Sequence, residues 1–317
     1  MEKKILHQQP RTLVIEDEHG MKTSYYPGLT WNGLGYSFPT EQMSIPKVKE
    51  SQVLLSRLDF LTQEAQESTP KLVDIDRSRK IFSAKNILRD ISRRYESLNQ
   101  DYFYASDKLF LENQAYLHSD LLYLIATTDG NEDTVGHSQL VARYTLLLTK
   151  ALEIDDRAFS VEIERGAMLH DIGKIGIPDS ILRKPGPLTD KEREIIKEHP
   201  FLGYEMVEEF MFLQKASRVV LFHHESYNGR GYPYGLKGEE IPLEARIFAI
   251  ADTLDAITSD RPYRKGESFR VAFDEIERVR GTQFDPNIVD AFLSVPEEKW
   301  QQIKLETEQS LSNYSIH

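Results

Sequence analysis

A histidine and an aspartate stand side by side at His170-Asp171, and Lys174 follows three residues later. Imidazole and carboxylate are ligands for divalent metals such as Fe, Mn or Zn, and a nearby lysine supplies a positive charge for a phosphate. The chain has no cysteine, so a thiolate zinc site is excluded. One such pair is weak evidence, because a lone His-Asp pair is more often a surface feature or a satisfied core group.

More residues with the same chemistry follow along the chain. Of the nine histidines, five lie between positions 137 and 224. Two aspartates stand further on, ahead of a basic segment that ends at Arg264. These residues together predict one site that binds metal, and the constellation comprises His137, His170, Asp171, His199, His223, His224 and Asp252, with Asp255 on the same helix as Asp252.

Helices are expected to carry the first of these ligands. The apolar residues from Ile163 to Leu169 predict a helix that ends near His170, and Gly173 is expected to terminate it because glycine accepts a positive φ. The segment from Thr189 to Glu192 has the form of a capping box, which predicts a helix that runs to His199 and stops before proline. Both histidines are therefore expected at helix ends.

A further helix is predicted around Asp252. An apolar stripe at helical spacing runs through Ile247, Ile250, Ala251, Leu254 and Ile257. Asp252, Asp255 and Ser259 lie on a different face of this helix, at spacings of three and four residues. We expect that face to line the site, and the alternative is an ordinary solvated helix face.

The region from about residue 115 to residue 317 resembles the HD-GYP domain, the branch of the HD phosphohydrolase superfamily that hydrolyses cyclic di-GMP. The resemblance rests on motifs in the family's order and spacing, namely His170-Asp-Ile-Gly-Lys174, His223-His-Glu225, Asn228-Gly-Arg-Gly-Tyr-Pro233, Ala251-Asp252 and Arg261-Pro-Tyr-Arg264. It implies a mainly α fold, with an all-helical HD-type catalytic domain.

The resemblance also implies two divalent metal ions, with iron expected and manganese as the alternative. Asp171 matches the ligand that bridges the two ions. The other ligands implied by position are His137, His170, His199, His223, His224 and Asp252. Asp133 stands where members with three metals tend to carry a glutamate ligand, which makes it the candidate ligand for a third ion, but its shorter carboxylate reaches less far than a glutamate and so counts against that ion.

The substrate side of the resemblance implies contacts from Lys174, Tyr232, Arg261 and Arg264 to the phosphates and bases of a cyclic dinucleotide. The expected reaction is two-metal hydrolysis of cyclic di-GMP to pGpG, to GMP or to both, by a hydroxide that bridges the ions. Catalysis is expected to depend on Asp171, Lys174 and Asp255, with Asp255 orienting Lys174. The alternatives are a hydrolase of another cyclic dinucleotide and a non-catalytic cyclic di-GMP receptor.

Composition limits the remaining classes of partner. The net charge of −12 argues against a binder of DNA or RNA polymers, which normally carries a basic face. No run approaches the roughly 20 apolar residues of a membrane span, and the first ten residues lack the apolar core of a signal peptide. A cytoplasmic protein is expected, and the absence of cysteine suits a reducing compartment.

The remaining segments predict the domain organisation. Short β-like runs favour a small N-terminal α+β module over residues 1–75, which we expect to be regulatory. A signalling protein partner is expected for the protein as a whole. Residues 76–114 are predicted to form an amphipathic helical linker. Residues 115–317 are expected to form the HD-GYP domain that the resemblance implies. Apolar residues from Ile81 to Leu109 repeat at heptad spacing. They indicate either a coiled coil that pairs two copies through residues 81–109 or a long helix packed on its own domain.

Overall fold

The structure is a computed structural model of the chain. It describes residues 72–99, 114, 117–126, 132–260 and 264–314, together with the backbone of strand residues 4–9, 12–16, 22–25, 30–31 and 36–37. Within the helices, the side chains of residues 72–76, 96–99, 132–134 and 312–314 are outside the described set. The chain divides into two compact units, Met1–Pro70 and Lys71–His317.

The first unit contains two small antiparallel sheets. Strands β1 (Lys4–Gln9), β2 (Thr12–Glu16) and β3 (Lys22–Tyr25) pair in the order β1-β2-β3, while β4 (Thr30–Trp31) pairs with β5 (Tyr36–Ser37). The sequence also has an apolar run at residues 53–55 that contributed to the predicted module, and it lies outside the described residues. Any helix of the predicted α+β module would also fall outside them, so that module stays a prediction.

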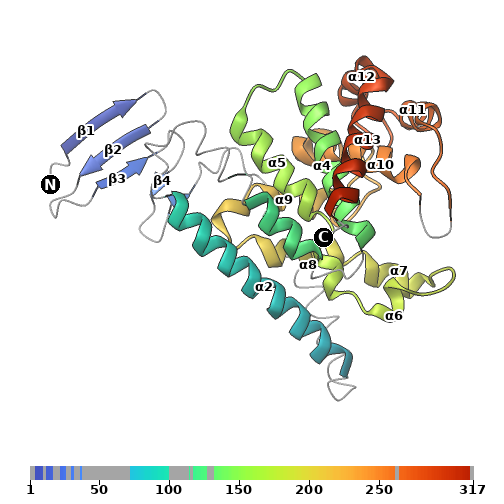
Figure 1. Cartoon of the computed structure of the whole chain (residues 1–317), viewed down its shortest axis with the longest axis horizontal. Coiled ribbons are helices and arrows are strands. Elements are labelled where there is room, and N and C mark those ends of the chain that lie inside the picture. Colours follow the sequence, from blue (N-terminus) through green and yellow to red (C-terminus); the bar gives the residue numbers. More distant parts are fainter. Residues whose placement is uncertain are drawn as a thin grey trace. The chain divides into compact units, whose positions relative to one another are not determined.

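The second unit is mainly helical, in agreement with the predicted fold class (Figure 1). Its regular elements are α2 (Leu72–Asn99), α4 (Glu132–Ala151), α5 (Arg157–Leu169), η3 (Ile172–Gly176), α6 (Asp179–Leu182), α7 (Asp190–Ile196), α8 (His199–Val207), η4 (Met211–Leu213), α9 (Ala216–Phe222), η5 (Gly238–Glu240), α10 (Leu243–Thr258), α11 (Phe269–Arg278), α12 (Pro286–Ser294) and α13 (Glu297–Tyr314). Residues 117–126 are also helical. Each described helix is too short or too polar to cross a lipid bilayer.

The core of this unit lies between four helices. Helix α4 packs on α5 and α10, and α5 packs on α9. Each contributes apolar side chains with no exposed surface, such as Leu148, Ala167, Val220 and Leu254. Because such tight burial leaves little freedom to a helix, the core fixes the relative positions of the polar residues that these helices carry.

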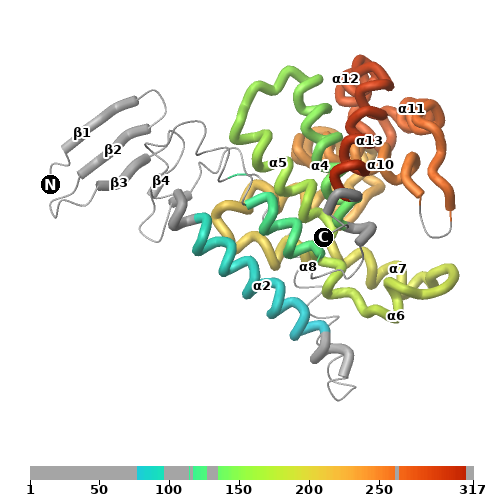
Figure 2. The backbone as a smooth tube through the Cα atoms, viewed as in Figure 1, coloured from blue at the N-terminus to red at the C-terminus, as the bar shows by residue number. Residues whose placement is uncertain are grey.

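Helix α2 shows how the heptad pattern is used. Ala84, Leu88 and Ile91 are fully buried within this single chain, where α2 packs on η3 and α8. Helices α2 and α8 can be followed in Figure 2. Ion pairs at its surface support the same docking, from Arg77 to Glu198 at 3.5 Å and from Lys80 to Asp179 at 3.0 Å. This burial supports the alternative of a long helix packed on its own domain, and pairing of two copies through residues 81–109 stays a prediction. The later repeat positions, including Tyr102, Ala105 and Leu109, lie outside the described residues.

Candidate metal centre

His170 lies at the point where α5 ends, as its sequence predicts. It is the C-terminal cap of α5, and it is only 2% exposed. Its Nδ1 lies 2.8 Å from the carbonyl oxygen of Ala167, so Nδ1 is the donor and Nε2 is left with a lone pair facing the site. A backbone carbonyl thus sets the orientation of this imidazole.

The same arrangement recurs at two further histidines. His199 Nδ1 lies 2.8 Å from the carbonyl oxygen of Ile196, and His223 Nδ1 lies 2.9 Å from that of Val220. In each case the partner stands three residues earlier, at a helix end whose carbonyls have no partner in the helix. All three buried imidazoles therefore present Nε2 to the same space.

His199 differs from its prediction in one respect. The capping box at Thr189 is present and starts α7, but α7 ends at Ile196, and His199 is the first residue of α8. Pro200 follows within the first turn of α8, where its missing N–H costs nothing. The prediction that the capping-box helix runs to His199 is wrong because the proline opens a helix instead of closing one.

Six of the predicted ligands form two groups of three. In each group the potential ligand atoms lie within 4.8 Å of one another, and the groups are His199, His223 and His224, and His137, His170 and Asp252. In the first group, His199 Nε2 and His223 Nε2 are 3.1 Å apart. In the second, His137 Nε2 is 3.3 Å from His170 Nε2 and 3.5 Å from an oxygen of Asp252.

Asp171 lies between the two groups. Its Oδ2 is 3.1 Å from His170 Nε2, and its Oδ1 is 3.2 Å from His199 Nε2. One carboxylate oxygen therefore faces each group, which is the arrangement that a bridging ligand requires.

The donor set fits a pair of divalent ions. Since Nδ1 is the donor in both His199 and His223, their facing Nε2 atoms are both acceptors, and they repel at 3.1 Å unless a cation or a proton lies between them. Imidazole nitrogens combined with carboxylate oxygens suit Fe, Mn or Zn. The geometry thus agrees with two ions, one at each group, and Asp171 between them.

Burial and charge shift the pKa values of these groups. Burial alone would raise the pKa of Asp171, but the positive charges of His170 and Lys174 outweigh it and hold that pKa well below its usual range. Burial and the neighbouring His199 lower the pKa of His224 to about 3. Burial also lowers the pKa of His223. These shifts favour an ionised carboxylate and neutral imidazoles, which are the metal-binding forms.

His170 is the exception. Burial acts to lower its pKa, but the adjacent Asp171 carboxylate outweighs burial and the pKa is raised. The centre therefore attracts positive charge at His170 Nε2, as a metal ion in that place would require.

Lys174 lies one turn after Asp171, and its Nζ donates to Asp171 Oδ2 over 2.5 Å. Its side chain keeps about a third of its surface exposed, so the ammonium group can also meet a bound anion. The short helix η3 holds this pair against α8 through Gly173. A Cβ on Gly173 would lie 2.0 Å from the carbonyl oxygen of His199, so the residue must be glycine because of this close approach. The prediction that Gly173 terminates the helix with a positive φ is wrong, because α5 ends at Leu169 and Gly173 lies within η3 without a positive φ.

Asp255 is buried behind His137. Its Oδ2 lies 2.6 Å from His137 Nδ1, and its Oδ1 accepts a hydrogen bond of 2.5 Å from Ser259. With Asp252 beside His137 as well, the face that carries Asp252, Asp255 and Ser259 does line the site. The predicted role of Asp255 as the partner that orients Lys174 stays a prediction, whereas its bond to His137 is direct.

Tyr232 packs against the group formed by His199, His223 and His224. Its ring stacks on His224, with centroids 4.6 Å apart and 24° between the planes. The turn that carries Tyr232 is held by Glu225, whose carboxylate accepts hydrogen bonds from the backbone N–H groups of Tyr234, Gly235 and Leu236. Gly229 has a positive φ of 80°, and Gly231 is required for close approach to the backbone of residues 224–226.

Three predicted residues are not brought into the centre by the described structure. Arg264 is exposed, and its guanidinium donates to the carbonyl oxygen of Ala256. Arg261 and the side chain of Asp133 lie outside the described residues. Their predicted roles stay predictions.

Sequence reasoning missed two residues at this site. Lys197, the C-terminal cap of α7, places its ammonium group 5.8 Å from the centre of the Tyr232 ring. Lys304, from α13, donates to Ser259 and to the carbonyl oxygen of Thr258. Lys197 stands two residues before His199, which is a local signal, whereas Lys304 is brought in by tertiary packing alone.

Known proteins resemble this chain over the same region. The family model of the HD domain matches residues 124–288, more than half of the 317 residues. The chain is 50% identical over 133 residues to the cyclic di-GMP phosphodiesterase response regulator RpfG of Xanthomonas campestris pv. campestris, which covers 41% of this chain and 35% of that protein.

Two further relatives extend this similarity. A cyclic di-GMP phosphodiesterase of Thermotoga maritima is 38% identical over 197 residues, covering 61% of this chain and 53% of that protein. A 3'3'-cGAMP-specific phosphodiesterase 3 of Vibrio cholerae is 37% identical over 181 residues, covering 55% of this chain and 39% of that protein. The chain thus spans about half of the length of these relatives or less. With the family match and the motifs of the metal centre in agreement, the chain belongs to the HD domain family, in its HD-GYP branch.

Proposed function

We propose that this protein is a metal-dependent phosphodiesterase that hydrolyses cyclic di-GMP to pGpG, to GMP or to both. The observation that carries the proposal is the position of Asp171, which turns one carboxylate oxygen to each of two groups of three metal-binding side chains. The relatives named as cyclic di-GMP phosphodiesterases support the choice of substrate.

Two divalent ions would be held by these groups. His199, His223 and His224 would hold one ion, and His137, His170 and Asp252 the other, with Asp171 shared. When bound, such a pair of ions supplies Lewis acidity that acidifies water and neutralises charge on a phosphate. Iron is the expected metal and manganese the alternative, and Asp133 is the candidate ligand for a third ion.

The chain's own residues would bind and orient the substrate. The Lys174 ammonium group, already paired with Asp171, would donate to an oxygen of the scissile phosphate and stabilise the charge that develops on it. As an N–H donor at this place, Lys174 could also return a proton to the leaving 3′ oxygen. Asp255, through its hydrogen bond, would hold the His137 ring in place during the reaction.

Outside the centre, three residues would recognise the dinucleotide. Tyr232, stacked on His224, offers the edge of its ring and its hydroxyl to a base. Arg261 and Arg264 would engage phosphate oxygens or a guanine edge, because guanidinium can donate two parallel hydrogen bonds. Arg264 can turn from the Ala256 carbonyl to a ligand, since it lies at the surface.

A second candidate function is hydrolysis of a hybrid cyclic dinucleotide. It is favoured by the relative named as a 3'3'-cGAMP-specific phosphodiesterase. A receptor that binds cyclic di-GMP without cleaving it is the third alternative. We also propose that residues 1–75 form a regulatory module, joined through residues 76–114 to the catalytic domain at 115–317, in a cytoplasmic protein with a signalling partner.

The test is product analysis by chromatography after anaerobic incubation of Fe(II)- or Mn(II)-loaded protein with cyclic di-GMP, and separately with 3'3'-cGAMP. The expected result is pGpG or GMP from cyclic di-GMP, lost in Asp171→Asn and retained in Asp274→Asn. The matched control, Asp274, is an exposed carboxylate on α11 that pairs with Arg270. Faster cleavage of 3'3'-cGAMP would support the second candidate, and binding without cleavage at full metal content would support the receptor.

A further inference from the structure

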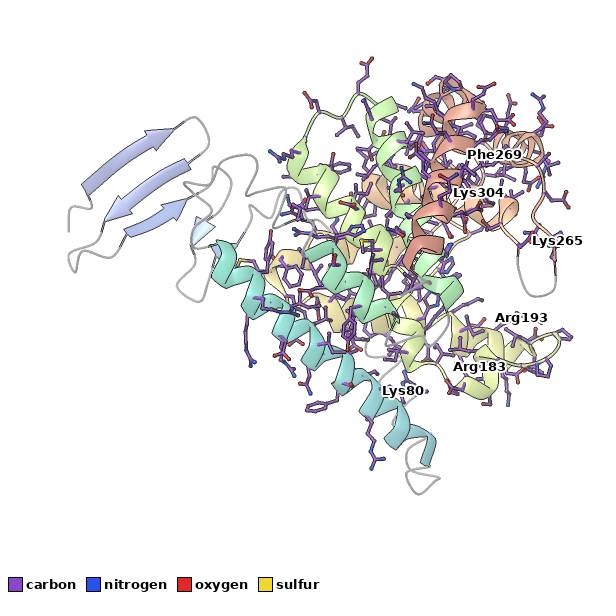
Figure 3. The ribbon with its side chains drawn as sticks, in the orientation of Figure 1. Lys80, Arg183, Arg193, Lys265, Phe269 and Lys304 are labelled. Atoms are coloured by element: carbon purple, nitrogen blue, oxygen red, sulfur yellow. The ribbon has the colours of Figure 1, made fainter. Side chains whose placement is uncertain are left out.

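A chain of polar contacts runs from the metal centre to the C-terminal helix. His137 Nδ1 lies 2.6 Å from Asp255 Oδ2, and Ser259 Oγ donates to Asp255 Oδ1 over 2.5 Å. Lys304 Nζ donates to Ser259 Oγ over 3.2 Å and to the carbonyl oxygen of Thr258 over 2.6 Å. Lys304 is carried by α13 (Figure 3), so these contacts connect α13 with His137 on α4 through the end of α10.

The chemistry of Lys304 decides which group donates and which accepts in each of these hydrogen bonds. An ammonium group only donates hydrogen bonds, so the Ser259 oxygen accepts from it and turns its own hydrogen to Asp255. The carboxylate of Asp255 only accepts, so His137 carries its proton on Nδ1. Nε2 of His137 is then left with a lone pair, facing His170 and Asp252.

We propose that Lys304 is a positioning residue for the metal ion of the His137 group. Its ammonium group orients the hydroxyl of Ser259, and that hydroxyl donates to the Asp255 carboxylate. The carboxylate then accepts from Nδ1 of His137, which stabilises the tautomer whose Nε2 can bind metal. Hydrogen-bond partners of metal-binding histidines set ring orientation and ligand basicity in this manner. The inference rests on the metal centre of the proposed function, and it adds a residue from a helix that carries none of the ligands.

The surroundings of Lys304 make its position specific. Thr258 is the last residue of α10, so its carbonyl lacks a partner in the helix and a lysine there also favours the helix dipole. Separate contacts between α4 and α13 fix α13 itself, including a 2.8 Å hydrogen bond from Arg143 to Thr307 and the edge-on packing of Tyr144 against Trp300. The docking of α13 therefore does not depend on Lys304.

Thr307 provides a matched control for the test. The variant Lys304→Met removes the ammonium group and keeps the apolar stem, while Thr307→Val removes a hydroxyl that ties α13 to α4 one turn further along. Binding of Mn(II) alone is measured by titration without nucleotide, so that hydrolysis is not needed. We expect Lys304→Met to reduce the affinity for one of the two Mn(II) ions about tenfold. This is the lower end of the range seen when a hydrogen-bond partner of a metal-binding histidine is removed. Thr307→Val should bind both ions as the wild type does.

Two backgrounds identify the affected ion. In a His224→Ala background, where the ion of the His137 group remains, Lys304→Met should still weaken binding. In a His137→Ala background it should have no effect. Ser259→Ala should reproduce the loss, the double variant Ser259→Ala/Lys304→Met should add nothing to it, and Lys304→Arg should restore binding.

Several results would overturn the inference. One is unchanged Mn(II) binding in folded Lys304→Met, and another is equal weakening of both ions by Lys304→Met and Thr307→Val. If Lys304→Met does not fold, Ser259→Ala carries the same test with the same two outcomes. Wild-type protein that binds two ions but cleaves no cyclic dinucleotide would remove the proposed function and leave the role of Lys304 standing.

Discussion

The phenol ring of Tyr232 lies stacked on the imidazole of His224, with 4.6 Å between the ring centroids. A residue expected to meet the substrate thus also packs on a candidate metal ligand. Such ring pairs contribute about 0.5–1.5 kcal/mol beyond their burial. The stack therefore links the loop that follows His224 to the orientation of His224 itself.

This stack leads to a prediction for two variants at position 232. Tyr232→Ala should reduce the affinity for the ion at His199, His223 and His224 by about 2- to 10-fold, which corresponds to the free energy of the stacking contact. Tyr232→Phe keeps the ring and should bind metal as the wild type does, although it loses the hydroxyl offered to the substrate. Mn(II) titration of both variants tests this. Equal weakening by Phe and Ala would show that the hydroxyl, and not the stack, supports His224.

The position of Asp171 predicts a difference between two aspartates. Asp252→Asn changes the carboxylate of the His137 group, so one ion should be lost and the ion of the His199 group retained. Asp171→Asn changes a side chain that faces both groups, so both ions should bind more weakly. The metal content after dialysis against buffered free Mn(II) gives the number of ions bound to each variant. Loss of a single ion in Asp171→Asn would contradict the shared position.

The histidine pKa shifts predict how the metal-free protein responds to acid. The pKa of His224 is about 3 in the folded chain, against 6.5 for an ordinary histidine. Between these values the unfolded chain takes up a proton that the folded chain refuses. The contribution of neutral His224 to the free energy of unfolding is therefore fully present above pH 6.5, and it is lost as the pH falls from 6.5 towards 3.

One proton of this kind changes the free energy of unfolding by up to about 1.4 kcal/mol per pH unit. Urea unfolding of chelator-treated protein at several pH values between 7 and 5 measures the slope. His224→Asn removes the titrating group and should make the slope shallower. A wild-type stability that is constant over this range, or an unchanged slope in the variant, would show that His224 does not resist protonation.

The buried apolar face of α2, formed by Ala84, Leu88 and Ile91, is expected to contribute to the folding stability of a single chain. Leu88→Ala should lower the free energy of unfolding by about 2–5 kcal/mol, because Leu88 has no exposed surface and its loss leaves a cavity. Phe82→Ala, on the same helix at 63% exposure, should change it by less than about 0.5 kcal/mol. If α2 paired two copies instead, the unfolding midpoint of Leu88→Ala would depend on protein concentration, which light scattering would confirm as a change in mass.

Local signals in the sequence account for much of the candidate site. The capping box at Thr189 works through hydrogen bonds that span three residues, so it can be read from the order of residue types alone. The apolar stripe around Ile250 likewise places Asp252 on a different face of one helix. The pairing of His-Asp with later histidines predicted the residues that meet at the centre.

Contacts between distant helices could not be read in the same way. Asp255 and His137 are 118 residues apart in sequence, and Lys304 reaches Ser259 across 45 residues. Their meeting depends on how α4, α10 and α13 pack, which no spacing along the chain encodes. Pro200 illustrates a different limit, because a proline is compatible with the end of one helix and the start of the next.

Gly173 allows the packing behind the metal centre to be tested directly. In Gly173→Ala the new Cβ would lie 2.0 Å from the carbonyl oxygen of His199 and 2.4 Å from the backbone nitrogen of Gly203, so η3 and α8 must separate. Overpacking of this kind costs typically about 1–3 kcal/mol. Because η3 follows Asp171 and α8 begins with His199, the separation should also weaken both metal ions. Urea unfolding and Mn(II) titration measure the two effects.

Gly186 supplies the control for this substitution. It has a φ of 131°, and a Cβ there would meet nothing within 4 Å. Gly186→Ala therefore adds backbone strain without a steric clash, and it should reduce stability while leaving Mn(II) affinity unchanged. If Gly173→Ala bound both ions as tightly as Gly186→Ala, the close approach of η3 to α8 would not be what holds Asp171 against His199. A loss of affinity confined to Gly173→Ala would instead show that one hydrogen atom in place of a side chain sets the distance between the two halves of the centre.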